Sequence, residues 1–424
     1  MKTLTAILIG AGNRGTAYTN IMARSEGRFK VIAVAEPIDS RRNYIRDKHG
    51  IPEENCFTDW KPLLAEGKIA DFAIVSTMDR DHFAPAMAAI DLGYDLLLEK
   101  PASSTPEDCL AIADAAEKKG VKVLICHVLR YTSFFMTLKK LIDDGAVGRV
   151  MSVNHEENVG NVHQTHSFVR GNWGNEKRSS PMLLQKSCHD MDILQWLLGK
   201  KCKKVQSFGM RSYFRAENAP AGAPERCIDG CPVGDTCPYN AVKLYFDDKK
   251  NAWFRTTCTR EANPTDETVE KALRTTQYGK CVFKCDNDVV DHQTVNLLFE
   301  DDVTVTFNMN AFNRGYRWIH ICGTKGEIHA VMADNKPIEL FDFASRKTTL
   351  IPASGMDGVT GGHGGGDDGI IDALYAYLTD SYHGKSVCGI RESVNNHLIV
   401  FAAEKSRAEG RVVDFDEYVA SLRK

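Results

Sequence analysis

The sequence predicts an α/β fold: a doubly wound parallel sheet followed by an α+β domain with a large open mixed or antiparallel sheet. In the first third of the chain, short apolar runs alternate with helical patterns, as in parallel strands joined by crossover helices. From about Tyr131, longer stretches of alternating residues take over, which is typical of antiparallel strands with one face covered by helices. The length of 424 residues exceeds what one compact core usually holds. We therefore expect two domains, at 1–128 and 129–424.

The elements follow in chain order. In the first domain, the apolar runs predict strands at 4–9, 29–35, 70–76, 95–98 and 121–126, with helices at 84–92 and 106–119 among them. The second domain begins with a helix at 134–143, and its alternating stretches predict strands at 150–158, 205–213, 289–299 and 303–310. A C-terminal helical pattern at 392–409 is stopped by Gly410, because glycine commonly ends helices.

A glycine motif, Gly10-x-Gly12-x-x-Gly15, directly follows the first predicted strand and precedes a helical pattern. In this setting the first glycine permits a tight turn, the second lets the backbone approach a pyrophosphate, and the third lets helix pack on strand. The N-terminus of the helix then faces the negative charge. The motif predicts a Rossmann-type dinucleotide site whose pyrophosphate is held by Gly10, Gly12, Asn13, Arg14 and Gly15.

A carboxylate marks the end of the second predicted strand. Glu36 lies about twenty residues past the last glycine, where an acid accepts hydrogen bonds from the ribose hydroxyls of NAD. Arg41 and Arg42 follow closely and could pair with a 2′-phosphate. The expected cofactor is therefore NAD, with NADP as the alternative.

Glu99 and Lys100 follow directly on the predicted strand at 95–98. The carboxyl ends of parallel strands are where open α/β sheets bind their ligands. A lysine near a nicotinamide ring could carry the proton of a substrate hydroxyl as hydride leaves the carbon. We expect the cofactor to be lined by Thr77, His82, Glu99 and Lys100, and the substrate by Arg130.

These features give the chain a resemblance to the Gfo/Idh/MocA family of oxidoreductases. The resemblance rests on the glycine motif, on Glu99-Lys100-Pro101, on a His/Asp segment near residue 189 and on the C-terminal segment 392–406. It implies a Rossmann domain followed by an open-sheet domain that serves substrate binding and oligomerisation. It also implies substrates such as sugars, polyols and their derivatives, and a homodimer or homotetramer.

The segment near residue 189 departs from the family pattern, which typically reads Asp-x-Gly-x-His-x-x-Asp on a helix. Here His189 and Asp192 match, but Gln185 replaces the acid and Ser187 replaces the glycine. Because glutamine cannot accept a proton, the acid/base role of the missing acid would pass to its neighbours. We expect Gln185 and Asp192 to contact the substrate.

Three titratable residues of this helix are candidates for that role: Lys186, His189 and Asp190. Their spacing of i, i+3 and i+4 lets all three project from one helix face. Repulsion between Lys186 and His189 would lower the proton affinity of both. We predict that Lys100 carries the hydroxyl proton and that His189, helped by Lys186, orients or shares it.

A glycine-rich loop at 361–369 precedes an apolar helical run that starts at Ile370. Its glycines would let backbone approach a ligand closely, and His363 and Asp367 could hydrogen-bond sugar hydroxyls. A related Gly-His-Gly-Gly segment occurs in the NAD-dependent glycosidases of this superfamily. The alternative is a loop in which Asp367 only caps the following helix.

Six of the thirteen cysteines fall between residues 227 and 285. An odd total scattered along the chain is not a disulfide framework. The closely spaced thiols in an insertion at about 218–240 would suit a structural zinc site, and the alternatives are an iron–sulfur cluster or unliganded thiols. The candidate ligands are Cys227, Cys231 and Cys237, with a fourth from Cys285 or Cys281.

Composition argues against several classes of function. Charged residues make up 26% of the chain, hydrophobic residues 43%, and the net charge is −3. This balance gives no electrostatic footprint for nucleic acid or an anionic membrane, and no apolar run reaches the length of a membrane span. The apolar stretch after Met1 runs straight into the glycine motif, so we interpret it as a strand rather than a signal peptide and expect a cytoplasmic protein.

Together these features predict an NAD-dependent dehydrogenase that transfers hydride between nicotinamide and a hydroxyl-bearing carbon of a sugar, sugar derivative or cyclic polyol. One alternative is a glycosidase that oxidises its sugar transiently and retains NAD. Another is a non-catalytic NAD-binding sensor or regulator, which the replacement of the acid by Gln185 would permit. Against the sensor, Lys100 and His189 are both present, and a sensor need not keep either.

Overall fold

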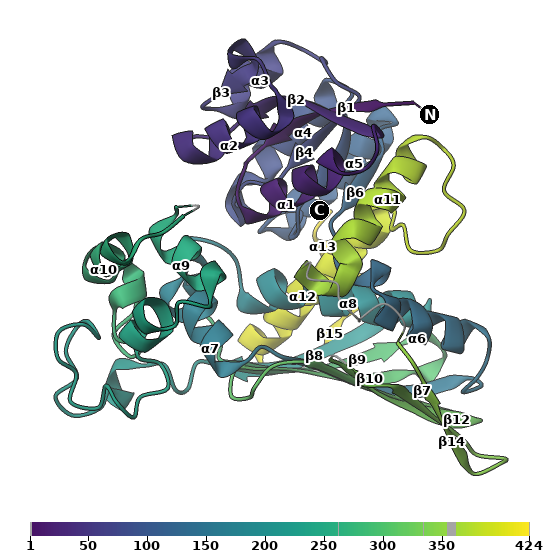
Figure 1. Cartoon of the computed structure of the whole chain (residues 1–424). Coiled ribbons are helices and arrows are strands. Elements are labelled where there is room, and N and C mark those ends of the chain that lie inside the picture. Colours follow the sequence, from purple (N-terminus) through teal and green to yellow (C-terminus); the bar gives the residue numbers. More distant parts are fainter. Residues whose placement is uncertain (1, 262, 334, 354–361, 424) are drawn as a thin grey trace.

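The computed structural model describes the chain apart from residues 1, 262, 334, 354–361 and 424 and the side chain of His363. It contains two sheets, each with its own helices (Figure 1). The first sheet is parallel and the second is mixed and mostly antiparallel, so the predicted fold class is confirmed. None of the described helices combines the length and the apolar composition needed to cross a bilayer.

The first sheet has six strands in the order β3-β2-β1-β4-β5-β6, and all neighbouring pairs are parallel. The strands are β1 (Leu4–Ile9), β2 (Phe29–Ala35), β3 (Cys56–Phe57), β4 (Phe72–Val75), β5 (Asp95–Leu98) and β6 (Val123–Ile125). The helices are α1 (Asn13–Ala23), α2 (Asp39–His49), α3 (Trp60–Ala65), α4 (Phe83–Asp91) and α5 (Pro106–Lys119). Because the strand order reverses between β1 and β4, the crevice at their carboxyl ends is the expected ligand site.

Local sequence sets the ends of these helices, as α5 illustrates. The Thr105 hydroxyl accepts a hydrogen bond from the Asp108 N–H at 3.3 Å, and Pro106 occupies the first helical position, which needs no N–H donor. At the other end, Gly120 adopts the left-handed conformation with φ of 67°. These signals fix the helix that follows the segment carrying Lys100.

The second sheet has nine strands in the order β14-β13-β12-β11-β7-β10-β9-β8-β15. The strands are β7 (Val150–Asn158), β8 (Cys202–Met210), β9 (His292–Phe299), β10 (Thr304–Asn310), β11 (Arg317–Gly323), β12 (Gly326–Met332), β13 (Ile338–Asp342), β14 (Lys347–Ile351) and β15 (Val413–Asp414). β7 and β10 are parallel, and the other pairs are antiparallel. The sheet is therefore mixed.

Among the residues that the structure describes, helices lie on one face of this sheet, and the other face has no helical layer (Figure 1). α8 (Met182–Leu198) and α12 (Ile390–Glu409) pack against each other and against the sheet. The remaining helices are α6 (Ser133–Asp143), α7 (Asn161–His163), α9 (Ala252–Thr259), α10 (Asp266–Thr275), α11 (Gly366–Leu378) and α13 (Phe415–Ser421). α11 crosses back and buries Ile370, Ile371 and Leu374 in the core of the first sheet, so the division at residue 128 stays a prediction.

The connection between β8 and β9 forms a lobe at the side of the molecule, which contains α9 and α10 (Figure 1). The predicted strands at 205–213 and 289–299 extend further into this connection than the observed ones, which stop at Met210 and begin at His292. The reason is Asp291, whose carboxylate accepts the N–H groups of Ser212 and Tyr213 at 2.8 and 2.7 Å. A side chain thus takes the place of a strand partner.

Candidate active site

The glycine motif forms the turn between β1 and α1. Gly10 has a φ of +91°, and a Cβ there would lie 2.6 Å from the Ser76 carbonyl oxygen. A Cβ on Gly15 would lie 2.2 Å from the Gly10 carbonyl oxygen, so both positions require glycine. At Gly12 the nearest atom to such a Cβ is Arg41 Nη1 at 4.0 Å. The backbone at Gly12 is therefore open to a ligand.

The start of α1 suits an anion. Gly12 is the N-cap, no side chain caps the helix, and its first turn contains no acidic residue. The backbone of Thr77 lies against Gly10, and its hydroxyl is buried without a hydrogen-bond partner in the described part of the chain. Open backbone, uncapped donors and an unpaired hydroxyl are the features that a bound dinucleotide would satisfy.

Glu36 is buried at the end of β2 and faces the same turn. Its carboxylate accepts the Ala11 N–H at 2.7 Å and the Ile38 N–H at 3.0 Å. Each carboxylate oxygen can accept a second hydrogen bond, as from a ribose hydroxyl. Arg42 is tied to the Glu36 carbonyl at 2.7 Å, whereas Arg41 borders the open space of the turn. Arg41 is thus the arginine better placed to reach a ligand phosphate.

Arg14 links the cofactor turn to two distant segments. Its guanidinium donates to Asp367 at 2.6 and 3.0 Å and to Glu99 at 3.0 Å. Burial would raise the pKa of Glu99, but the charges of Arg14 and Lys100 and a hydrogen bond from Tyr18 outweigh it and lower the pKa. The structure therefore places Asp367 beside the cofactor turn, and its contact with substrate stays a prediction.

The glycines before and in α11 allow that helix to pack closely on the turn η3 (Val128–Tyr131). A Cβ on Gly366 would lie 2.3 Å from the Val128 carbonyl oxygen, and one on Gly369 would lie 2.7 Å from Tyr131 Cβ. His363 belongs to the preceding turn η10 (Gly362–Gly365), and its side chain lies outside the described residues. Its contact with a sugar stays a prediction.

His82 supports the loop that carries Lys100. It is buried, with Nδ1 2.7 Å from the Pro101 carbonyl oxygen and Nε2 3.2 Å from the Thr77 carbonyl oxygen. Both ring nitrogens thus face backbone oxygens. The ring therefore holds the two loops together, and its contact with the cofactor stays a prediction.

His397 of α12 supports the same loop from the other side. Its Nδ1 lies 2.7 Å from the Ser393 carbonyl oxygen, and its Nε2 accepts the Ala102 N–H at 3.1 Å. Burial and the neighbouring His127 lower the pKa of His397 to about 3. The imidazole is therefore neutral at ordinary pH, and the C-terminal helix fixes the backbone that follows Lys100.

Lys100 reaches from the first sheet to the second domain. Its Nζ donates to the Gln185 carbonyl oxygen, in the first turn of α8, at 2.8 Å. His189 lies one turn further along that helix, is 5% exposed, and has its ring centre 6.3 Å from that of His127. The structure thus brings the Lys100 amine to the helix face that carries Gln185 and His189.

Four charged side chains form what we call the cleft cluster: Lys186 and Asp190 of α8, Glu157 of β7 and Arg317 of β11. Lys186 Nζ is 3.3 Å from Glu157 Oε1, and Arg317 pairs with both carboxylates. Burial lowers the pKa of Lys186, and Glu157 opposes this effect while Arg317 and Lys100 add to it. The cluster therefore pairs two cations with two carboxylates, and it lies close enough to Lys100 for that charge to influence the pKa of Lys186.

Asp190 is fully buried within this cluster. Its carboxylate lies 2.8 Å from Arg317 Nε and 2.9 Å from His155 Nε2. Burial alone would raise the pKa of Asp190, but Arg317 and His155 outweigh it and hold the pKa well below its ordinary value. The contacts of Asp190 hold the Arg317 guanidinium in place, and its acid/base role stays a prediction.

Sequence reasoning missed four residues around this site: Glu157, His163, Trp253 and Arg317. His163 ends α7, and burial, with Lys186 next in importance, lowers its pKa well below the ordinary value. The Trp253 ring lies perpendicular to it, with ring centres 5.2 Å apart, and is 41% exposed. A histidine following a predicted strand was a weak signal, and nothing in the sequence places the distant α9 beside it.

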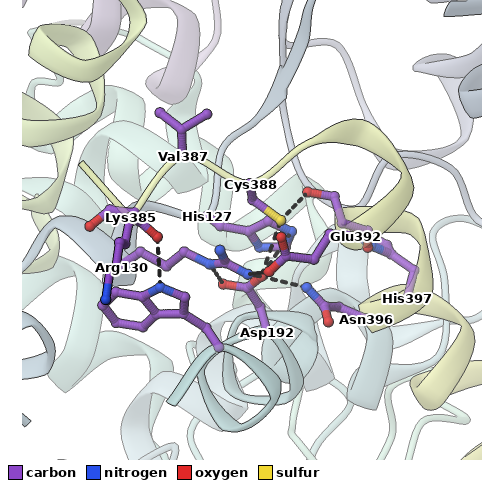
Figure 2. A network of polar contacts seen from close by, with 12 residues as sticks. His127, Arg130, Asp192, Lys385, Val387, Cys388, Glu392, Asn396 and His397 are labelled. Atoms are coloured by element: carbon purple, nitrogen blue, oxygen red, sulfur yellow. Dashed lines mark hydrogen bonds and ion pairs between the residues drawn. The ribbon is translucent and has the colours of Figure 1, made fainter. Parts of the chain in front are cut away.

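Arg130 and Asp192 form a separate junction cluster with Glu392 and Asn396 of α12 (Figure 2). Arg130 donates to the two Asp192 oxygens at 2.8 and 2.7 Å and to Glu392 at 2.8 Å. Asn396 donates to Asp192 at 2.5 Å. Both Arg130 and Asp192 are 1% exposed. They bind each other where the segment after β6 meets α8 and α12, and their contact with substrate stays a prediction.

The cysteines of the lobe surround a small apolar pocket, but they do not converge on one point. Within the described residues, no three of these sulfurs lie within 4.8 Å of one another. Burial raises the pKa of the Cys237 and Cys281 thiols, and that of Cys285 to about 11. The predicted zinc site is unsupported. The cysteines that line the pocket are Cys227, Cys231, Cys237 and Cys281, without Cys285.

Comparison with known protein families finds two matches that together span most of the chain. Residues 4–127 match a family described as "Oxidoreductase family, NAD-binding Rossmann fold". Residues 139–415 match its companion, "Oxidoreductase family, C-terminal alpha/beta domain". Both describe halves of the Gfo/Idh/MocA oxidoreductases.

Individual relatives are distant. A putative oxidoreductase, YteT, of Bacillus subtilis is 25% identical over 72% of both chains. An inositol 2-dehydrogenase of Salmonella typhimurium is 26% identical over 49% of this chain and 58% of its own length. This chain therefore matches little more than half of that enzyme.

Solved structures share the fold. An oxidoreductase from Agrobacterium radiobacter, in complex with NAD+, L-tartaric acid and magnesium, has a TM-score of 0.70 at 15% identity, over 98% of this chain and 99% of that one. A scyllo-inositol dehydrogenase from Lactobacillus casei with bound NAD(H) and scyllo-inositol has a TM-score of 0.66 at 14% identity, over 98% and 100%. With the two family matches, the chain belongs to the Gfo/Idh/MocA family of NAD-binding oxidoreductases.

Proposed function

We propose that the protein is a dehydrogenase that transfers hydride between NAD and a hydroxyl-bearing carbon of a sugar, sugar derivative or cyclic polyol. The observation that carries the proposal is the 2.8 Å contact between Lys100 Nζ and the Gln185 carbonyl oxygen. It joins the carboxyl edge of the parallel sheet to the helix that carries His189 and Lys186. A substrate placed at this contact would touch both domains.

Lys100 handles the hydroxyl proton. When bound, the nicotinamide ring accepts or supplies the hydride. In the oxidising direction, the C–H bond breaks as hydride leaves the substrate carbon, and the O–H proton passes to the Lys100 amine. In the reducing direction, the Lys100 ammonium returns that proton to the carbonyl oxygen. Gln185 and His189 orient the hydroxyl, and the cleft cluster binds the rest of the substrate.

The groups around Lys186 suit a polyhydroxylated ring. Lys186 supplies donors, while Glu157 beside it supplies carboxylate acceptors. The half-exposed Trp253 adds an aromatic face next to His163. Sugars and cyclic polyols combine ring hydroxyls with apolar C–H faces, so this mixture supports the proposed substrate class, which is also that of the named inositol dehydrogenases.

For the cofactor, the buried Glu36 carboxylate supports NAD, since a 2′-phosphate would bring like charge to it. Arg41 beside the open turn would moderate that preference. The homodimer or homotetramer stays a prediction from the family resemblance.

The proposal is tested by incubating the protein with NAD and a panel of free sugars, polyols, sugar acids and aryl glycosides, and following reduced nicotinamide by absorbance. Net NADH formed from a free sugar or polyol supports the dehydrogenase. Glycoside cleavage without accumulated NADH would assign the internal-redox chemistry of a glycosidase instead. Cofactor binding with no turnover of any compound would favour the sensor.

A further inference from the structure

The helix-free face of the second sheet carries a group of histidine, glutamate and cysteine side chains on β11 and β12. In this antiparallel pair, His320 lies directly opposite His329, and Cys322 directly opposite Glu327. Their neighbour Ile321 is fully buried under the helices, as is Ile328. Since side chains alternate along strands, these four residues share the opposite face.

The side-chain atoms converge. One ligand atom from each of His320, Glu327 and His329 lies within 4.8 Å of the other two. His320 Nε2 is 2.9 Å from Glu327 Oε2 and 3.3 Å from Cys322 Sγ. The two imidazoles are stacked with ring centres 3.8 Å apart. The outward residues of two strands thus gather two imidazoles and a carboxylate around one point, with the Cys322 sulfur beside His320 at the edge of this group.

We propose that His320, Glu327 and His329, with Cys322 as a fourth donor, bind a divalent transition metal ion of the zinc class. Two imidazoles, a carboxylate and a thiolate match the ligands and the coordination number of tetrahedral zinc. The same set disfavours magnesium and calcium, which prefer all-oxygen sites. Zinc is the expected ion, and cobalt(II) and nickel(II) would bind by the same donors.

Hydrogen bonding alone satisfies this group poorly. His320 Nε2 faces both Glu327 and Cys322, yet one ring nitrogen either donates or accepts a hydrogen bond, so it cannot pair well with both. A metal ion would bind the nitrogen, the carboxylate and the thiolate together and release the thiol proton. The side chains of His320, Glu327 and His329 are 19%, 32% and 44% exposed, so an ion can reach them from solvent.

The site is independent of the proposed dehydrogenase activity. Arg317 of the cleft cluster and His320 belong to the same strand, but they are three residues apart and point to opposite faces of the sheet. The ion would link β11 to β12 through side chains of both strands and so stabilise the sheet. Loss of the metal should therefore change stability, whereas turnover depends on groups across the sheet.

The first test titrates the full-length, metal-free protein with cobalt(II) and follows the visible and near-ultraviolet absorption. We expect one equivalent to give tetrahedral visible bands and a near-ultraviolet thiolate-to-cobalt band. Cys322→Ser should remove the thiolate band while keeping the visible bands. Loss of an outer hydrogen-bond partner weakens a metal site by about tenfold or more. The double variant His320→Ala/His329→Ala removes two ligands, so it should weaken cobalt binding by much more than about tenfold. Cys227→Ser/Cys231→Ser is the matched control and should bind as the unchanged protein does.

The second test measures thermal unfolding with and without zinc. Zinc should raise the Tm of the unchanged protein, because ligands of the folded state stabilise it. The double histidine variant should unfold at the Tm of the metal-free protein and show no zinc shift, which establishes that it is folded. The proposal is overturned if the unchanged protein binds no cobalt, if the double variant binds it equally well, or if only the Cys227→Ser/Cys231→Ser control loses it.

Discussion

The cleft cluster and the junction cluster use the same kinds of side chain for different purposes. In the junction cluster, Arg130 makes a bidentate pair with Asp192, and α12 adds hydrogen bonds from Asn396 to Asp192 and from Arg130 to Glu392 (Figure 2). In the cleft cluster, Lys186 has one carboxylate partner at 3.3 Å, and the nearby Lys100 amine donates to a backbone carbonyl. The junction cluster holds the segment after β6 against α8 and α12, whereas the Lys186 and Lys100 amines use only part of their donor capacity within the protein and can also bind a ligand.

The two clusters each use an aspartate of α8, and these aspartates are only two positions apart in the sequence. Asp190 and Asp192 are about 200° apart around α8, because each residue of an α-helix turns the chain by about 100°. Asp190 therefore faces the sheet, where Arg317 meets it, and Asp192 faces Arg130 and α12. The residue type is the same, and the partner surface decides what each carboxylate does.

The largest expected effect is on stability, from breaking the junction cluster. Asp192→Asn removes the bidentate, fully buried countercharge of the Arg130 guanidinium and leaves only Glu392, and we expect it to lower the free energy of unfolding by about 3 kcal/mol or more. Urea denaturation followed by circular dichroism measures it. The control is Asp144→Asn, which removes an exposed pair with Lys140 and should cost no more than about 1 kcal/mol. Equal losses in the two variants would contradict the assignment of a structural role to the junction cluster.

Breaking the cleft cluster should instead affect substrate binding. Lys186→Gln leaves Glu157 paired with Arg317, so we expect little change in Tm. The KM for the substrate should rise about tenfold, the effect of losing one charge-assisted hydrogen bond. Steady-state kinetics and a thermal melt of the same sample measure both. A large fall in Tm with an unchanged KM would show that Lys186 stabilises the fold, as the residues of the junction cluster do, and does not bind substrate.

The pH dependence sharpens the same point. Burial lowers the pKa of Lys186 below the ordinary lysine value of 10.5. Its positive charge is therefore present at low pH, and as the pH rises the charge is lost before the pH at which an ordinary lysine loses its proton. We expect KM to rise as the pH increases through that lowered pKa. Lys186→Arg, which keeps its charge, should flatten this rise in a KM-against-pH profile. An unchanged profile in the variant would assign the rise to another group.

The smallest expected effect concerns cofactor choice. Arg41→Ala should weaken NADP binding by about tenfold, since one charge-assisted hydrogen bond to a 2′-phosphate is lost. NAD binding should change little. Fluorescence titration with NADH and NADPH separates the two, with Arg42→Ala as the companion variant. An equal loss of affinity for NADH and NADPH would indicate that Arg41 contacts the pyrophosphate, which both cofactors share.

Short-range signals made much of the fold and the cofactor turn predictable from sequence. The glycines at 10 and 15 are required by contacts within one strand–turn–helix unit and its neighbouring strand. The partners of Asp190 and Asp367 were not predictable in this way, because Arg317 and Arg14 come from distant parts of the chain. Helical spacing indicates which face a side chain shares, but the element that packs there is set by the tertiary fold.

Cysteine spacing failed for a related reason. Short intervals between Cys227, Cys231 and Cys237 bring the backbone together, yet thiol direction depends on the surrounding loops, and the sulfurs stay apart. His320 and His329 gave no such signal, because their closeness comes from strand register.

The measurement that tests the central claim most directly compares Lys100→Met with the unchanged protein in two assays, NADH binding by fluorescence and turnover of the substrate identified by the panel. If Lys100 carries the hydroxyl proton, kcat/KM should fall by about 10²- to 10⁴-fold. The Kd for NADH should stay unchanged. A loss of NADH affinity as large as the loss of turnover would contradict the account and make Lys100 a residue that binds cofactor.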